Sequence, residues 1–182
     1  MTGRATVIDG DTLEIAGQRI RLHGIDAPES GQFCRDSRNR KWRCGQKSAL
    51  ALDGRIGRAP VVCHLTGTDR YGRHIGTCLS GKTNLNGWLV RQGWAVAYRK
   101  YSSVYIRDEF IAADQGAGIW QGPFVWPADW RKGVRETVTR ADGRNEDCAI
   151  KGNINRTGTR IYHLPGTKWY DRTHINASHG DR

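Results

Sequence analysis

No stretch of this 182-residue sequence is apolar over the roughly 20 residues that a membrane-spanning helix needs, so a membrane protein is not expected. The chain is also short of acids: 18 Asp and Glu face 29 Lys and Arg, which leaves a formal net charge of +11. The basic residues are spread through folded-looking sequence and interleaved with seven Trp and six Tyr. This distribution favours a nucleic-acid partner over a membrane surface, although a high charge can also serve solubility alone.

A Cys-x-x-Cys motif is missing as well, which argues against a zinc site, although the chain has five cysteines. Cys63 and Cys78 fall in two strand-like runs that a hairpin centred near Arg70 would set nearly opposite each other, and Cys34 and Cys44 close a short loop. Each disulfide would add roughly 2 to 4 kcal/mol of stability and would indicate an oxidising compartment. Reduced, buried thiols are the alternative. No signal peptide is visible, and the cysteines favour a mature secreted or periplasmic chain over a cytosolic one.

The most informative stretch is residues 7–29, where two runs with alternating polar and apolar residues predict a pair of half-buried strands. A two-residue turn at Gly17–Gln18 would place Ile15 opposite Ile20. In the same register Glu14 lies opposite Arg21, on the face away from the acids discussed next. Any role for Arg21 beside those acids therefore requires a bend or bulge in its strand.

Three acids emerge at one end of this predicted hairpin: Asp11, Asp26 and, just beyond them, Glu29. Like charges this close resist joint ionisation unless a positive group lies among them. Carboxylate oxygens suit a hard cation such as Ca²⁺ or Mg²⁺ better than Zn²⁺. A solvated acidic turn is the alternative, because Asp9-Gly10 is also the dipeptide most typical of hairpin turns.

Two motifs, one within this stretch and one farther along the chain, make a resemblance to a known family specific. Val-Ile-Asp-Gly-Asp-Thr at residues 7–12, followed by Gly-Ile-Asp-Ala-Pro-Glu at residues 24–29, resembles the active-site segment of the staphylococcal nuclease (thermonuclease) family. Asp-Arg-Tyr-Gly-Arg at residues 69–73 resembles the other signature of that family. The two motifs occur in the order that the family shows, and both disulfide pairings are similar to those of its cysteine-bearing bacterial members.

The fold expected from the pattern is mainly β with α (α+β). Helical spacing predicts three helices, over Gln46–Ile56, over Asn84–Gln92, and after an N-cap at Ser103. Five strands with interposed helices indicate an OB-fold, and the resemblance implies the same five-stranded barrel packed by three helices.

The chain is expected to divide into three parts. Residues 1–122 would form the thermonuclease-like domain, 123–147 a linker, and 148–182 a small β-rich C-terminal module. Two strands over 149–154 and 159–164 predict a hairpin in that module. The part resembles a small module that follows some bacterial thermonuclease-like domains and that carries a second cysteine further on. That cysteine is missing here, so Cys148 is left without a partner, and the resemblance implies a truncated module.

The resemblance implies a role for each site residue. Asp11, Asp26 and the backbone carbonyl of Ala27 would hold Ca²⁺, with Mg²⁺ or another divalent cation as the alternative. The family commonly has Thr at the position of Ala27, but a main-chain ligand survives that change. Glu29 would act as general base on the attacking water, and Arg21 and Arg73 would clamp the phosphate with paired N–H donors.

Other residues are expected to contact the substrate. The resemblance implies that Arg70, Tyr71 and Tyr98 lie near the nucleotide, although the tyrosines could instead pack the barrel mouth. Residues 30–45 form an arginine-rich insertion in which Trp42 could offer a stacking face. A solvated loop held by the disulfide is the other interpretation of that insertion.

The resemblance therefore implies a Ca²⁺-dependent, sugar-non-specific endonuclease. It would be a monomer that acts on DNA and RNA and leaves 3′-phosphates. The rival hypothesis is a non-catalytic OB-fold module that binds nucleic acid or a protein. The presence of all five expected acids and arginines favours the enzyme.

Overall fold

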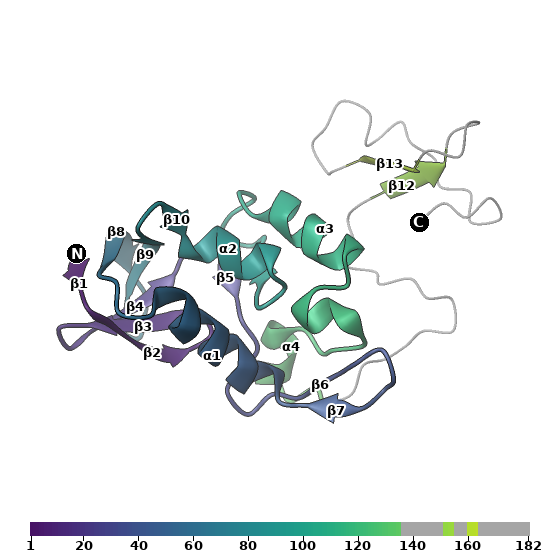
Figure 1. Ribbon diagram of the computed structural model, residues 1–182, viewed down its shortest axis with the longest axis horizontal. Helices are drawn as coiled ribbons and strands as arrows, with labels where there is room; N and C mark the ends of the chain where they lie inside the picture. Colours follow the sequence, from purple (N-terminus) through teal and green to yellow (C-terminus); the bar gives the residue numbers. More distant parts are fainter. Residues whose placement is uncertain (136–150, 155–159, 164–182) are drawn as a thin grey trace. The chain divides into compact units, whose positions relative to one another are not determined.

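A computed structural model of the chain describes residues 1–135, 151–154 and 160–163 (Figure 1). Contacts divide the chain into two units, Met1–Thr137 and Val138–Arg182. In the second unit, β12 (Lys151–Ile154) and β13 (Arg160–His163) pair as an antiparallel hairpin, as the sequence predicts. The turn predicted between them, Cys148, and residues 136–147 of the predicted linker lie outside the described residues.

The first unit is built on a seven-stranded sheet in the order β1-β8-β9-β4-β3-β2, with β10 paired to β9. Neighbouring strands are antiparallel except β4 and β9, which are parallel. The strands are β1 (Thr2–Gly3), β2 (Ala5–Asp9), β3 (Thr12–Ile15), β4 (Gln18–Leu22), β8 (Val61–Thr68), β9 (His74–Ser80) and β10 (Thr83–Asn84). Two short pairs complete the β-structure: β5 (Ile25–Asp26) with β11 (Val96–Ala97), and β6 (Cys34–Arg35) with β7 (Lys41–Trp42).

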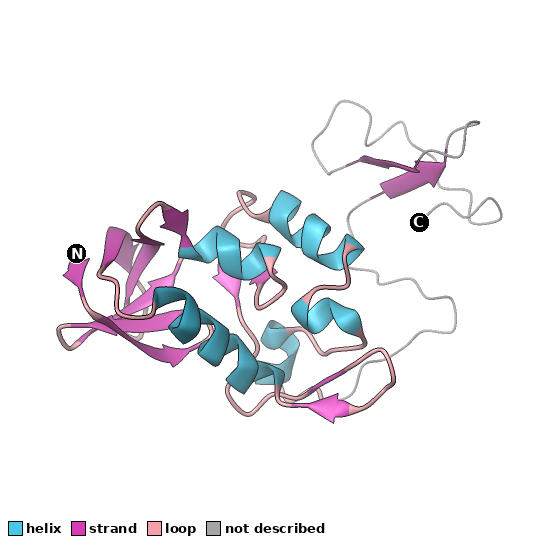
Figure 2. Cartoon of the chain, viewed as in Figure 1, coloured by secondary structure: helices cyan, strands magenta, loops and turns pink. Residues whose placement is uncertain are grey.

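Helices enclose the core beside this sheet. Figure 2, read with the labels of Figure 1, shows the sheet at one end of the unit, α1 and α2 beside it, and α3 farther from it. Apolar side chains from the strands, α1 and α2 form one buried cluster that includes Leu13, Ile20, Leu52 and Leu89. The helices are α1 (Cys44–Ile56), α2 (Leu85–Arg91), α3 (Ile106–Asp114), α4 (Pro127–Arg131) and the 3₁₀ helix η1 (Gly118–Gln121). The predicted fold class, mixed α and β with an OB-type sheet, is confirmed.

The third predicted helix begins later than expected. α3 starts at Ile106 with Tyr105 as N-cap and no side-chain cap, so the prediction of Ser103 as the cap is wrong. The helix buries Glu109 and Ala112. The burial of the Glu109 carboxylate is compensated by two hydrogen bonds that it accepts, one from the Ala97 N–H and one from Arg99, each at 2.6 Å. A polar residue thus ties this helix to β11, which apolar periodicity alone could not indicate.

The predicted register of the first hairpin is wrong by two residues. Ile15 lies opposite Gln18 and Leu13 opposite Ile20, so the turn is Ala16–Gly17. Both turn residues have positive φ, 49° and 75°, as the tight turns that match the strand twist require. A shift of two keeps every side chain on its predicted face, because the strand repeat is also two residues.

Both expected disulfides are present. Cys63 lies directly opposite Cys78 in the β8–β9 ladder, and the two are bonded. The second bridge joins Cys34 to Cys44, at the start of α1. It lies in a separate buried cluster with Val96 and Ile119, against which Trp42, Trp120, Phe124 and Trp126 pack.

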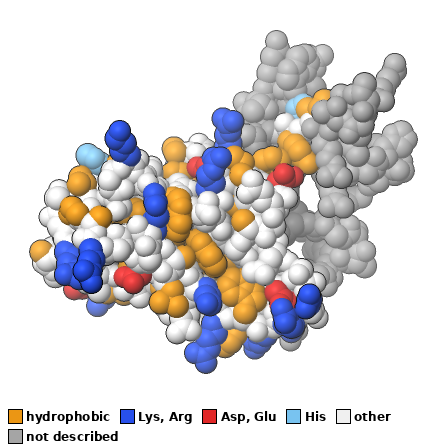
Figure 3. Space-filling view, viewed as in Figure 1, with side chains coloured by type: hydrophobic (Ala, Val, Ile, Leu, Met, Phe, Trp, Pro, Cys, Tyr) orange, Lys and Arg blue, Asp and Glu red, His pale blue; other side chains and the backbone are white. Residues whose placement is uncertain are grey.

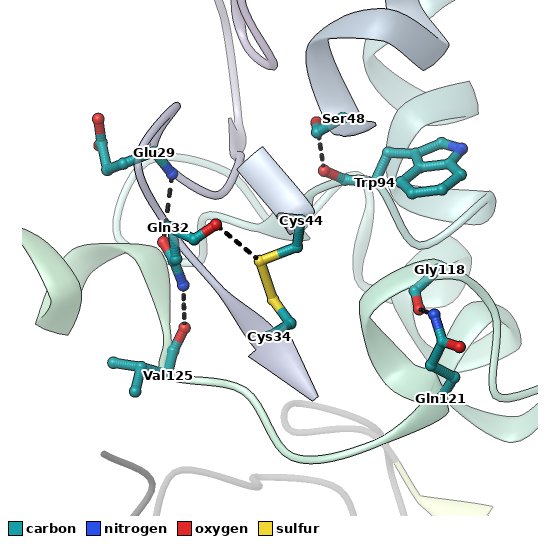
Figure 4. Close-up of a disulfide and its surroundings, with 9 residues drawn as sticks. All are labelled: Glu29, Gln32, Cys34, Cys44, Ser48, Trp94, Gly118, Gln121 and Val125. Carbon is teal, nitrogen blue, oxygen red and sulfur yellow. Dashed lines mark hydrogen bonds between the residues drawn. A yellow bond between two sulfur atoms is a disulfide. The ribbon is translucent and has the colours of Figure 1, made fainter. Parts of the chain in front are cut away.

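The segment that follows η1 packs onto the disulfide-bonded loop. The buried side chain of Gln32 donates to the Val125 carbonyl at 2.6 Å, and its Oε1 accepts the Glu29 N–H at 3.2 Å (Figure 4). The Gln32 carbonyl also lies 3.6 Å from Sγ of Cys44. These contacts fix the path of the chain into α4. That path lies in residues 123–135, the described part of the segment predicted as a linker.

Candidate active site

Two buried carboxylates share one guanidinium at the end of the β3–β4 hairpin. Asp11 follows β2 and Asp26 lies on β5, and both side chains are almost fully buried. Arg21 of β4 donates from Nη1 to Asp11 at 2.6 Å and from Nη2 to Asp26 at 2.9 Å. The second Asp11 oxygen accepts the Ala27 N–H at 3.0 Å. Such charge-assisted bonds compensate for the cost of burying the carboxylates.

A second arginine joins Asp26 to Glu29. Arg131, the last residue of α4, donates from Nη2 to Asp26 at 2.8 Å and from Nη1 to Glu29 at 2.7 Å. The sequence predicts that three carboxylates converge on one rim, and the structure links the three through two guanidinium groups. Asp9 does not take part in these bonds, and its side chain caps the turn by accepting the Asp11 N–H at 3.0 Å.

Burial and pairing act in opposite directions on the ionisation of these groups. Desolvation raises the pKa of Asp11 to about 7, although Arg21 and the Ala27 N–H act to lower it. Desolvation by itself lowers the pKa of Arg131, but hydrogen bonds to Asp26 and Glu29 outweigh this and raise it overall. The buried acids therefore need a positive partner, and the arginines supply one.

Arg21 reaches these acids without a bulge in its own strand. Thr12 lies directly opposite Arg21 in the β3–β4 ladder, and Glu14 lies opposite Arg19 instead. The predicted Arg21–Glu14 pair is therefore wrong, because the register differs by two residues. The irregularity lies in β2, between Val7 and Asp9.

Asp11, Glu29 and the two arginines line one open cleft of about 1270 Å³, and the buried Asp26 lies behind them, bonded to both arginines. Arg73 lies on its wall, held by Asp69, which accepts from Arg73 Nε at 2.8 Å and from its backbone N–H at 3.0 Å. The structure shows no contact between Arg73 and the three acids among the interactions of the described residues. The predicted substrate-contacting residues Arg70, Tyr71 and Tyr98 line the same cleft.

The exposed ring of Tyr71 lies close to the guanidinium groups of two arginines. The guanidinium carbons of Arg70 and Arg73 lie 4.9 Å and 5.6 Å from its centroid. Tyr98 makes an edge contact with Tyr101 at 4.9 Å. Flat rings beside guanidinium groups suit nucleotide bases next to phosphates.

Trp42 does not have the position that a stacking platform would need. Its ring packs edge-on against Trp94 at 6.4 Å and its Nε1 is buried. No residue of the insertion 30–45 is among the described residues that line the cleft. Lys and Arg side chains are nevertheless distributed over the face seen in Figure 3.

The donor set of the site fits a hard cation. Asp11 and Asp26 offer only oxygen atoms, and each is already held by a positive group. Within the described part of the chain, no three His, Cys, Asp or Glu side chains form a group that could hold an ion. A cation here would therefore also need backbone, water or substrate oxygens.

Arg131 is the site residue that sequence reasoning missed. It lies 105 positions from Asp26 and 102 from Glu29, in a segment predicted to be a linker. The only local signal was Trp126-Pro127, in which Pro is favoured in the first turn of a helix.

Comparison with known proteins bears on these observations. Residues 19–122 match the family model described as "Staphylococcal nuclease homologue". The succinoglycan biosynthesis protein ExoI of Rhizobium meliloti (strain 1021) is 46% identical over 123 residues, which cover 65% of this chain and 64% of that protein. An uncharacterized endonuclease of Haemophilus influenzae is 33% identical over 69% of this chain and 70% of its own length. A micrococcal nuclease of Shigella flexneri is 31% identical over 72% of this chain and 80% of its own length.

Proposed function

Because the chain belongs to the staphylococcal nuclease family, we propose that it is a Ca²⁺-dependent, sugar-non-specific endonuclease of DNA and RNA. Relatives named as nucleases support a nuclease function. The observation that carries the proposal is the pair of buried carboxylates, Asp11 and Asp26, at a basic cleft that also contains Glu29 and Arg73.

Asp11, Asp26 and the Ala27 carbonyl would hold the cation. Ca²⁺, or Mg²⁺ as the alternative, would neutralise charge on a non-bridging phosphate oxygen when bound. Glu29 is suited to accept the proton of the attacking water, because its carboxylate lies at the cleft while its backbone N–H is held by Gln32. The water oxygen would bond to phosphorus as the P–O5′ bond breaks; the 5′ oxygen would take a proton from solvent and leave as a hydroxyl, and the phosphate would remain on the 3′ oxygen.

The arginines would bind the phosphate. Arg21 supplies positive charge at the floor of the cleft, and its position is set by Asp11 and Asp26. Arg73 presents a planar donor group from the wall, oriented by Asp69. A guanidinium can form two parallel hydrogen bonds to a phosphate, which an ammonium cannot.

Compartment and assembly are part of the proposal. The two disulfides are compatible with a secreted or periplasmic protein. No helix of the described residues is long and apolar enough to cross a membrane. We propose a monomer whose partners are its DNA and RNA substrates.

The experiment is incubation with supercoiled plasmid DNA and with RNA, in Ca²⁺, in Mg²⁺ and in a chelator. Cleavage of both polymers with Ca²⁺, products with 3′-phosphates and no cleavage in chelator are expected. A protein that binds both polymers tightly yet cleaves neither with any divalent cation is instead a binding module.

A further inference from the structure

The two terminal nitrogens of Arg131 each bind a different carboxylate of the site. Asp26 accepts Arg21 on Oδ1 and Arg131 on Oδ2, so both of its oxygens are occupied by guanidinium groups. Glu29, the proposed general base, is paired with Arg131 as well. Each oxygen keeps a second lone pair, but a cation that binds Asp26 is repelled by both guanidinium groups and so competes with these arginine contacts.

Arg131 is the arginine that can give way. Its side chain is 36% exposed, whereas that of Arg21 is 19% exposed and is fixed between two acids from a strand inside the main sheet. Arg131 extends from the end of a five-residue helix into the cleft. The more exposed side chain loses less when its ion pair opens, because water can solvate the freed guanidinium.

The position of α4 does not depend on this ion pair. The chain enters the helix from Val125, whose carbonyl is held by the buried Gln32 (Figure 4). Trp126, just before the helix, packs against Trp120 and Phe124 beside the Cys34–Cys44 bridge. The segment that carries Arg131 lies outside the matched range 19–122 and is anchored to residues inside it through contacts that do not involve the Arg131 side chain.

Local charge favours such an exchange. Asp11, Asp26 and Glu29 carry three negative charges when ionised, and Arg21 and Arg131 carry two positive charges. The set therefore has a charge of −1, a divalent cation would raise it to +1, and withdrawal of Arg131 would then lower it to zero. The cation and Arg131 therefore oppose each other electrostatically, because both would bind the same Asp26 carboxylate, which is almost fully buried and so little screened by salt.

We propose that Arg131 is a built-in counter-ion that sets the cation affinity of this site. Without a cation it holds Asp26 and Glu29, and the arrival of a divalent cation frees both Arg131 and Glu29. The inference rests on the proposed function, since it takes Asp26 as a cation ligand.

The test measures Ca²⁺ binding by calorimetry in the absence of nucleic acid, with Ca²⁺ alone as the probe. Arg131→Gln should bind Ca²⁺ roughly 10-fold more tightly than the parent, because the competing charge is gone. Arg131→Lys should lie between the two, since an ammonium keeps the charge but cannot bridge two carboxylates with a planar fork.

Arg135→Gln is the matched control. It removes the same charge from the same segment, but the Arg135 guanidinium lies over the Trp130 ring at 4.2 Å and donates to the Val134 carbonyl, away from the acids. The difference between the two Gln variants therefore isolates the local competition from the change in net charge. Melting curves in chelator should show that all variants are folded, because α4 is anchored through Val125.

The outcomes separate the inference from the proposed function. A parent that binds Ca²⁺ and cleaves, together with an Arg131→Gln variant that binds Ca²⁺ no more tightly than Arg135→Gln, overturns the inference alone. Tighter Ca²⁺ binding by Arg131→Gln without cleavage by any variant supports the inference and overturns the nuclease proposal. Absence of Ca²⁺ binding in every variant overturns the inference, and cleavage without any cation would then refute the metal dependence.

Discussion

Replacement of Glu29 by Gln tests the proposed chemistry most directly. The substitution keeps the shape of the side chain and an oxygen that can still accept from Arg131 Nη1, which lies 2.7 Å from Oε1. It removes only the charge and the basicity. The backbone N–H of residue 29 stays bonded to Gln32, so the path of the loop should not change.

The expected magnitudes for stability and for rate differ widely. The Glu29 and Arg131 side chains are 39% and 36% exposed, and an ion pair at that exposure contributes less than about 1 kcal/mol to stability. General-base catalysis typically supplies about 10²- to 10⁴-fold, or roughly 3 to 5 kcal/mol of the barrier. The variant should therefore melt close to the parent while its cleavage rate falls at least about 100-fold.

The assay compares initial rates on supercoiled plasmid at saturating Ca²⁺ with DNA binding in chelator over a range of salt concentrations. Binding should weaken with salt as steeply as in the parent, because the basic surface still releases counterions from the phosphates. Glu14→Gln is the control, since within the described part of the chain the Glu14 carboxylate pairs with the exposed Arg19, at 3.7 Å, and with none of the site residues. Cleavage by Glu29→Gln at the parent rate would refute Glu29 as the base.

Three further predictions concern the cation ligands, the clamp and the disulfides. Asp11→Asn combined with Asp26→Asn should abolish the rise in melting temperature that Ca²⁺ produces, because the cation loses both charged ligands; an unchanged rise would place the ion elsewhere. Arg73→Lys should lose turnover with little change in the salt dependence of binding, because an ammonium keeps the charge but not the paired donors that Asp69 orients; parent-like turnover would contradict the clamp. Mass spectrometry without reductant should find two linked pairs, and free thiols at these positions would remove the argument for an oxidising compartment. The pairs are Cys34–Cys44 and Cys63–Cys78.

Local patterns determined much of the fold. Two strand-like runs around Cys63 and Cys78, with a hairpin centred near Arg70, were enough to predict that the cysteines lie nearly opposite each other, and in the antiparallel ladder they lie directly opposite. The end of the first helix at Ile56 followed from spacing and from Gly57, whose positive φ of 57° suits a residue without a Cβ, whereas the helix starts at Cys44, two residues before the predicted Gln46. Such signals lie within a few residues of what they specify.

Turn geometry was harder to predict. Gly17 was placed at the first turn position, but the turn uses Ala16 there with positive φ, which is uncommon for a residue with a side chain. Sequence periodicity cannot detect a slip of two residues, because the faces are unchanged. The error changed which residue lies opposite Arg21 and which lies opposite Glu14, but not the face on which Arg21 lies. The irregularity that the sequence predicts in the strand of Arg21 lies instead in β2, between Val7 and Asp9.

The sequence by itself determined which acids and arginines are present, and it ordered them along two motifs. Only the tertiary structure decided how they are paired, because a buried carboxylate takes its counter-charge from whatever element folding brings near. Asp26 is paired with Arg21, five residues away in the sequence, and with Arg131, 105 residues away. Val125 and Trp126 pack against the loop that the Cys34–Cys44 disulfide closes, and this packing brings Arg131 next to Asp26. No periodic pattern in the sequence indicates that packing.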